Sequence, residues 1–154
     1  FACEVMSYFK PAFTFVNLGA VDACHSNFSS YLGALHRADH AVGHLWNHIQ
    51  SIPEMAGNTT LILTPECGRN LQPNNILDEN DWRAYDHSDE NSMRIWTMMA
   101  GPNVPQGLTI GGEDNPVGMV TDTMMTVCDI LGVMPEVQAG GVVHPGTDSL
   151  FNRI

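Results

Sequence analysis

Short apolar runs predict three buried strands. Residues 13–18 and 59–64 are rich in aromatic or branched side chains, and Gly19 and Pro65 follow them directly. Such punctuation is typical of a buried strand that ends at a turn. Residues 93–100 form a third run of this kind and lead into a Gly-Pro pair. The pattern therefore places three strands along the first hundred residues.

Two longer segments have the spacing of amphipathic helices. Across residues 30–52, apolar positions recur every three or four residues until Pro53, which predicts a long helix. Residues 120–131 predict a second helix that ends at Gly132. Because the strands alternate with helices, the expected fold class is α/β, a three-layer sandwich with a mostly parallel sheet flanked by helices.

Three segments have no regular pattern of their own. Residues 68–91 are too rich in Asn, Asp and Pro to be regular, and they predict a functional loop. Residues 108–110 form a short extended piece before a Gly-Gly turn, and residues 134–154 form a Gly-rich tail without an assigned element. We expect residues 1–154 to make a single domain or half-domain.

Composition narrows the classes of partner. The 154 residues are 44% hydrophobic and 15% charged, which suits one globular domain, and the formal net charge of -11 disfavours nucleic acid and anionic membranes. No apolar run approaches the roughly 18 residues of a membrane span. The sequence begins at Phe1 rather than Met, so we expect a processed product or a fragment.

Clusters of metal-ligand residue types occur at three places. Asp22 and His25 follow the first apolar run, Glu66 and Cys67 follow the second, and His87 lies in the polar loop. An α/β protein places its chemistry where strands end. Carboxylate, imidazole and thiolate groups suit zinc or another divalent ion. These residues predict a metal-dependent hydrolase site.

The order of these motifs resembles the carboxy-terminal half of the alkaline phosphatase superfamily, which includes phosphatases, sulfatases and phosphodiesterases. The resemblance extends from about Phe13 to Val133. It includes the Ala-Gly-Pro-Asn-Val-Pro-Gln-Gly segment at residues 100–107 and the Asp-Thr-Met-Met-Thr segment at residues 122–126. It implies an alkaline phosphatase-like domain that hydrolyses small phosphate or sulfate esters.

The resemblance also implies a ligand set for two metal ions. Asp22, His25 and His87 would bind one ion, although the family usually spaces its first Asp and His by four positions rather than three. Glu66 and Cys67 stand where the family has an Asp-His pair that binds the second ion. Arg69 is a weaker candidate for an anion contact, because a guanidinium fork fits a tetrahedral oxyanion.

The resemblance leaves out the part of the family that carries the nucleophile. The nucleophilic Ser or Thr lies in the amino-terminal half of the family's domain, so this chain alone is expected to be inactive. Its partner would be that missing half or a second copy of itself. Many family members are exported, which suggests an extracytoplasmic location.

A row of histidines belongs to this chain rather than to the family pattern. The predicted long helix places His36, His40, His44 and His48 at four-residue spacing along one face. Neighbouring histidines at this spacing can chelate zinc, nickel or copper. The alternatives are a contact surface between chains and an ordinary polar helix face.

A second function class fits the same residues. A solvated Asp22, a capping Asp86 and a buried structural Cys67 would need no metal. A sheet without its neighbouring strands exposes edges that recruit another chain. The alternative prediction is therefore a non-catalytic assembly subunit, an oligomer or filament, built from a degenerate domain of this type.

Overall fold

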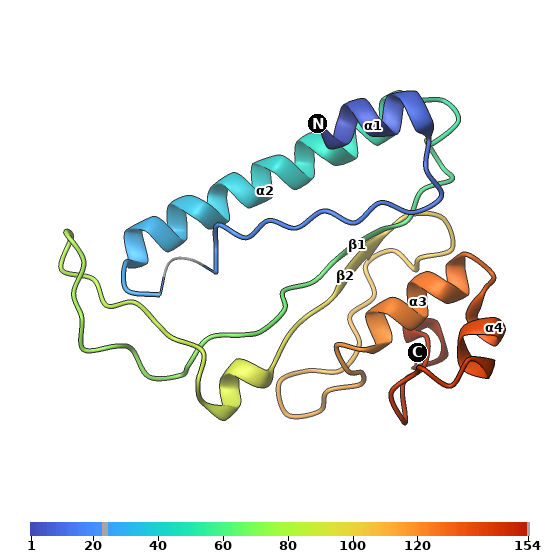
Figure 1. Ribbon diagram of the computed structural model, residues 1–154. Coiled ribbons are helices and arrows are strands. Elements are labelled where there is room, and N and C mark those ends of the chain that lie inside the picture. The colour runs from blue at the N-terminus through green and yellow to red at the C-terminus, as the bar shows by residue number, and fades with distance from the viewer. Residues whose placement is uncertain (23–24, 154) are drawn as a thin grey trace. The chain divides into compact units, whose positions relative to one another are not determined.

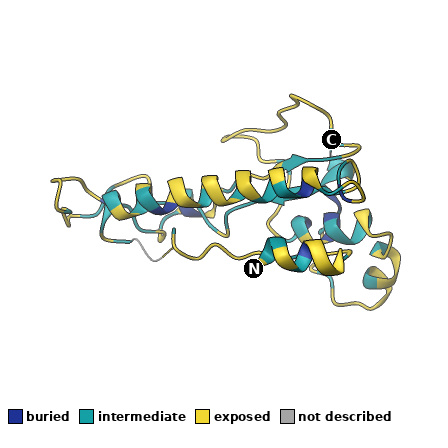
Figure 2. Ribbon diagram, turned by 90° about the horizontal axis from the view of Figure 1, so that it is seen from above, coloured by how far each residue is buried: buried dark blue, intermediate teal, exposed yellow. Residues whose placement is uncertain are grey.

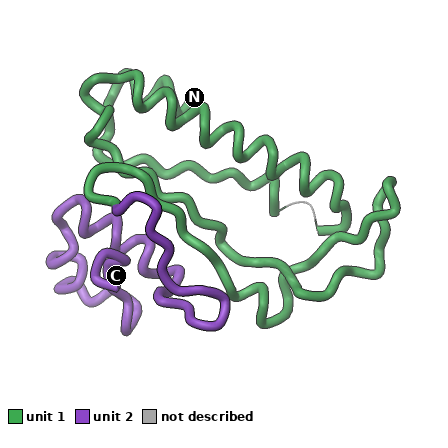
Figure 3. Tube along the Cα trace, turned by 180° about the vertical axis from the view of Figure 1, so that it is seen from behind, with its two compact units in different colours: residues 1–104 green, residues 105–154 purple. Residues whose placement is uncertain are grey.

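A computed structural model describes residues 1–22 and 25–153, and the chain divides into two compact units, Phe1–Val104 and Pro105–Ile154 (Figure 3). The first unit contains helices α1 (Ala2–Phe9) and α2 (Phe28–Ser51), strands β1 (Leu61–Leu63) and β2 (Met98–Ala100), and the 3-10 helix η1 (Glu90–Met93) (Figure 1). The second unit contains α3 (Asp122–Ile130), α4 (Met134–Ala139) and the 3-10 helix η2 (Leu150–Arg153).

Helix α2 confirms the predicted long helix to within two residues at each end. It begins where the Asn27 side chain accepts a hydrogen bond from the Ser30 backbone N–H at 2.7 Å, which satisfies one of the free donors of the first turn. The Asp78 carboxylate accepts from the backbone N–H of Ser29 at 2.8 Å. This second contact fixes the polar loop to the start of the helix.

The apolar core of the first unit lies between α1 and the end of α2. Met6 from α1 and Ile49 from α2 are buried together with Met55, and Leu45 and Ile52 pack against them. The sequence pattern missed α1, whose single buried residue is Met6. A short helix with one buried side chain has little periodicity to detect.

The predicted three-layer sandwich with a mostly parallel sheet is wrong. Among the described residues the sheet has two strands, and β1 runs antiparallel to β2 with Leu61 opposite Ala100 and Leu63 opposite Met98. A parallel pair needs a long crossover, usually a helix, to return the chain to the same end of the sheet. Residues 64–97 are instead mostly irregular and turn the chain back. The expected alkaline phosphatase-like, sulfatase-like α/β fold therefore has no basis in the structure.

The prediction of a buried strand at residues 13–18 is also wrong. The segment is extended, but among the described residues it joins no sheet, and no backbone hydrogen bond ties it to them. Figure 1 shows it as the blue trace that follows α1. Phe15 remains 77% exposed. The composition of a strand is present, but the described part of the chain offers no neighbouring strand that would bury it.

The second unit is organised around one buried carboxylate. Asp122 is fully buried at the start of α3, where it accepts from the backbone N–H groups of Met119 at 2.8 Å and Asp148 at 2.9 Å. The guanidinium of Arg153 pairs with it at 2.6 Å. Helix α3 confirms the core of the predicted 120–131 helix, whereas α4 lies in the tail for which the pattern predicted no element.

None of the helices in the described part of the chain is both long and apolar enough to cross a membrane.

Candidate metal centre

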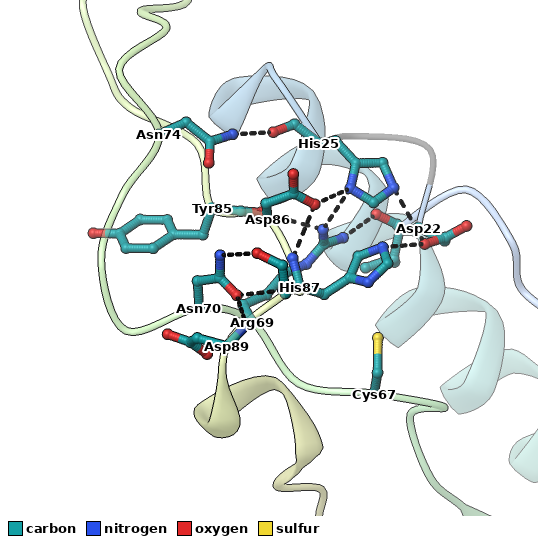
Figure 4. A network of polar contacts seen from close by, with 12 residues as sticks. Asp22, His25, Cys67, Arg69, Asn70, Asn74, Tyr85, Asp86, His87 and Asp89 are labelled. Carbon is teal, nitrogen blue, oxygen red and sulfur yellow. Dashed lines mark hydrogen bonds and ion pairs between the residues drawn. The ribbon is translucent and has the colours of Figure 1, made fainter.

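Three of the predicted metal ligands meet in the first unit (Figure 4). One ligand atom each from Asp22, His25 and His87 lies within 4.8 Å of the others. Asp22 Oδ1 is 3.4 Å from His25 Nε2 and 3.9 Å from His87 Nε2. His25 is half-buried, while Asp22 and His87 are exposed. Solvent therefore reaches this cluster directly.

The two distances from Asp22 are close to those around a tetrahedral ion. A zinc ion at about 2.1 Å from each of two ligand atoms holds those atoms about 3.4 Å apart. The Asp22–His25 distance matches this value, and the Asp22–His87 distance exceeds it by 0.5 Å. A small rotation of the exposed His87 ring would close that difference. The donor set, one carboxylate and two imidazoles, is also one that zinc accepts.

Asp86 orients one of the histidines, whereas the sequence predicted for it only a capping role. Its Oδ1 lies 3.1 Å from His25 Nδ1 and accepts a second hydrogen bond from the His87 backbone N–H at 2.9 Å. These two contacts hold the pKa of Asp86 below its usual range. Arg69 Nη1 also lies 3.4 Å from Nδ1, but the Asp86 contact is shorter, so the ionised carboxylate favours the proton on Nδ1 and leaves Nε2 free on the side of Asp22. Its position directly before His87 was the available signal.

Arg69 binds the backbone of both segments that carry the ligands of the cluster. Its guanidinium donates to the carbonyl oxygens of Val21 at 2.8 Å and Tyr85 at 3.2 Å. It also lies over the Tyr31 ring, 5.1 Å from its centre. Arg69 thus ties the residue before Asp22 to the chain just before His87. The predicted anion contact stays a prediction, because these donors already face carbonyl groups.

The Asn-rich loop supplies the remaining support. Asn74 donates from its side chain to the His25 carbonyl at 2.7 Å. The side-chain oxygen of Asn70 accepts from the backbone N–H groups of Ser88 at 2.6 Å and Asp89 at 2.9 Å. Amide side chains satisfy backbone groups that an irregular loop leaves without secondary-structure partners. The polar composition that predicted a functional loop at residues 68–91 serves here to hold its shape.

The second predicted pair does not join the three-ligand cluster. Cys67 Sγ donates to Glu66 Oε1 at 3.5 Å. Burial raises the pKa of the Cys67 thiol, and the charges of Glu66 and Asp22 raise it further. Figure 4 shows Cys67 beside the cluster without a contact to its ligands. A second metal site at Glu66 and Cys67 stays a prediction. Cys24, next to His25, is outside the described residues together with Ala23.

The histidine row on α2 is not uniform. His36, His40 and His44 are exposed. His48 is half-buried, with its Nε2 at 2.9 Å from Ser7 Oγ and 3.0 Å from the Cys3 carbonyl of α1. Three of the four side chains are therefore open to solvent, and the fourth connects the two helices. Metal binding by this row stays a prediction.

Comparison of the chain with protein-family models, curated proteins and solved structures finds no match. The resemblance to the alkaline phosphatase superfamily stays a prediction from the motifs, and the hydrolase class has no support from relatives. The function of this site therefore rests on its own geometry.

Proposed function

We propose that this chain binds one divalent metal ion, zinc in preference to others, through Asp22, His25 and His87. The observation that carries the proposal is the convergence within 4.8 Å of three ligand atoms, two from neighbouring Asp22 and His25 and one from the distant His87. Surface acids and histidines also meet by chance. Here, however, the Asp86 carboxylate contacts His25 Nδ1, the ring nitrogen that faces away from Asp22. Zinc-binding histidines in proteins commonly have such a carboxylate partner.

The ligand count indicates the kind of site. Structural zinc sites have four protein ligands, whereas catalytic sites have three and keep a position open for water or substrate. Three ligands on an exposed surface fit the second class. Bound zinc lowers the pKa of a coordinated water and polarises an ester oxygen. Asp22, His25 and His87 would hold the ion, and Asp86 would keep the His25 ring in register.

Hydrolysis of a phosphate or sulfate ester is a separate prediction that depends on this site. It requires zinc-dependent release of product from a simple aryl phosphate or aryl sulfate. That release has to disappear in His87→Ala, which keeps the backbone N–H that bonds Asp86. Zinc binding without turnover would support the metal site and contradict the hydrolase prediction.

The test is the zinc stoichiometry of the purified full chain, measured by elemental mass spectrometry after removal of loosely bound metal. The reference protein carries Ala at His36, His40 and His44, because these exposed histidines could bind zinc weakly and add to the count. We expect close to one zinc ion per chain. His25→Ala and His87→Ala, each made in this background, should lose it.

Two results would contradict the proposal. One is a reference protein that retains no zinc and shows no zinc binding in calorimetry. The other is a His25→Ala variant that keeps the full stoichiometry. Far-UV circular dichroism of each variant checks that the helices remain, so that loss of zinc reports loss of a ligand.

A further inference from the structure

An open apolar groove lies between α2 and one face of the sheet in the first unit. It encloses about 520 Å³ and is lined by Val42 and Trp46 from the helix and by Leu61, Leu63 and Met98 from the strands. Leu63 lies opposite Met98 in the antiparallel register, so their side chains share one face. Protein interiors have few voids larger than a water molecule. This groove is therefore an apolar surface that the first unit leaves uncovered.

The sheet beside this groove is itself incomplete. A pair of three-residue strands is marginally stable in water, and three or more strands with an apolar face are needed for independent stability. Among the described residues, neither β1 nor β2 has a second strand partner. Figure 2 shows that α2, which covers this region, is itself exposed along much of its length. A third strand would complete the sheet and fill the groove.

The chain carries a segment with the properties of that strand. Residues 13–18, Phe-Thr-Phe-Val-Asn-Leu, are extended and have no charged side chain. Phe13, Phe15, Val16 and Leu18 are 45%, 77%, 41% and 39% exposed. Because side chains alternate along a strand, these residues place apolar groups on both faces, as in strands buried on both sides.

We propose that two copies of this chain associate by strand exchange, each donating residues 13–18 to the free edge of the other's β1–β2 sheet. Alternate side chains of the donated strand would enter the groove under α2. The exchange is reciprocal, so it closes as a dimer rather than a filament. This proposal does not depend on the metal centre.

The area of the contact and its small charge suit a second copy as the occupant. The donor is uncharged, and the groove lining contains one acidic residue, Asp39, beside His40 and His44. The net charge of -11 therefore lies mostly outside the contact. At about 200 Å² for a Phe side chain, Phe13 and Phe15 together expose about 240 Å². With Val16, Leu18 and the covered groove, two exchanges bury on the order of 1,000 Å², the lower limit for a specific interface.

Two substitutions test the two halves of the contact. Phe15→Glu charges the donor strand at its most exposed position. Gly43→Leu fills the groove, because Gly43 lines it and a Cβ there would meet open space. Leu also has a higher helix propensity than Gly, so this variant should keep its fold. Phe9→Glu and Ala41→Leu are the matched controls, at exposed positions outside the donor strand and the groove lining.

Sedimentation velocity of the full chain gives the first result. We expect the wild type and both controls to sediment as a dimer of the 16.8 kDa chain. Phe15→Glu and Gly43→Leu should each raise the dimer dissociation constant by at least about 30-fold, the loss typical of a buried aromatic contact. Thermal melting should show that each variant remains folded.

Mixing the two variants distinguishes strand exchange from any other dimer. The Phe15→Glu chain keeps an open groove, and the Gly43→Leu chain keeps an intact donor. An equimolar mixture, with one chain isotope-labelled, should form a heterodimer through a single exchange, seen by native mass spectrometry. A monomeric wild type would overturn the proposal, as would folded variants that dimerise like the controls or a mixture that stays monomeric.

Discussion

Asp86 should control the zinc affinity of this chain without touching the ion. The carboxylate lies 3.1 Å from His25 Nδ1, on the opposite side of the ring from Asp22. Asp86→Asn keeps the size and an oxygen that can accept the hydrogen bond, but it removes the negative charge. His25 then becomes a weaker base toward the ion and is held less firmly in its orientation.

The expected loss follows from contacts of this kind. Removal of a second-layer partner of a zinc-bound histidine lowers metal affinity by about 10- to 100-fold, or roughly 1.4–2.7 kcal/mol. The pKa of Asp86 is held below its usual range by the His87 backbone N–H and by His25. The carboxylate is therefore ionised throughout the neutral range, so Asp86→Asn removes a full negative charge at neutral pH.

The assay is competition for zinc with a chromophoric chelator, in the background that lacks the exposed histidines of α2. Asp81→Asn is the matched control, because it removes the same charge from the same loop. Asp81 has a backbone φ of 60°, which Asn tolerates. An Asp86→Asn affinity within about twofold of the control would refute the orientation argument. That outcome would leave zinc binding by the other three residues intact.

Two further predictions concern stability. Asp122→Asn breaks the pair with Arg153, so the free energy of unfolding of residues 105–154 should fall by about 3 kcal/mol. This value is the low end for a buried pair, because the Arg153 side chain keeps 26% exposure and water can solvate its charge. Hydrogen exchange in α3 would measure the loss, and unchanged protection would contradict it. Burial raises the pKa of Asp78, but N–H donors from Ser29 and neighbouring residues outweigh burial and bring it from 3.8 to about 2. Ionised Asp78 therefore stabilises the fold above pH 3.8, and this contribution is lost as the pH falls through 2. Asp78→Asn should lower the melting temperature at pH 6, with a difference from wild type that shrinks toward pH 2; a difference independent of pH would contradict this assignment.

The sequence alone determined the segments that depend on local order. Helix α2 was predicted because its apolar residues repeat over six turns and Pro53 follows its end, and the central part of α3 was predicted for a similar reason. The positions of β1 and β2 lie inside predicted apolar runs. Residue chemistry by itself also marked Asp22, His25 and His87 as metal-ligand residue types. Each of these inferences uses neighbours within one segment, or the residue type alone.

Tertiary structure decided everything that depends on contacts between distant segments. Strand direction is a property of the connection, so the apolar runs could not show that β2 returns antiparallel or that residues 13–18 have no partner within the described chain. The role of Asp86 depends on the position of a ring 61 residues earlier in the sequence. The approach of Asp22 to His87 likewise depends on loop contacts that the Arg69 side chain makes across the fold. Local sequence patterns predict which helices and strands form, because those depend on interactions within one segment. Distances between separate segments are set only when the whole chain packs.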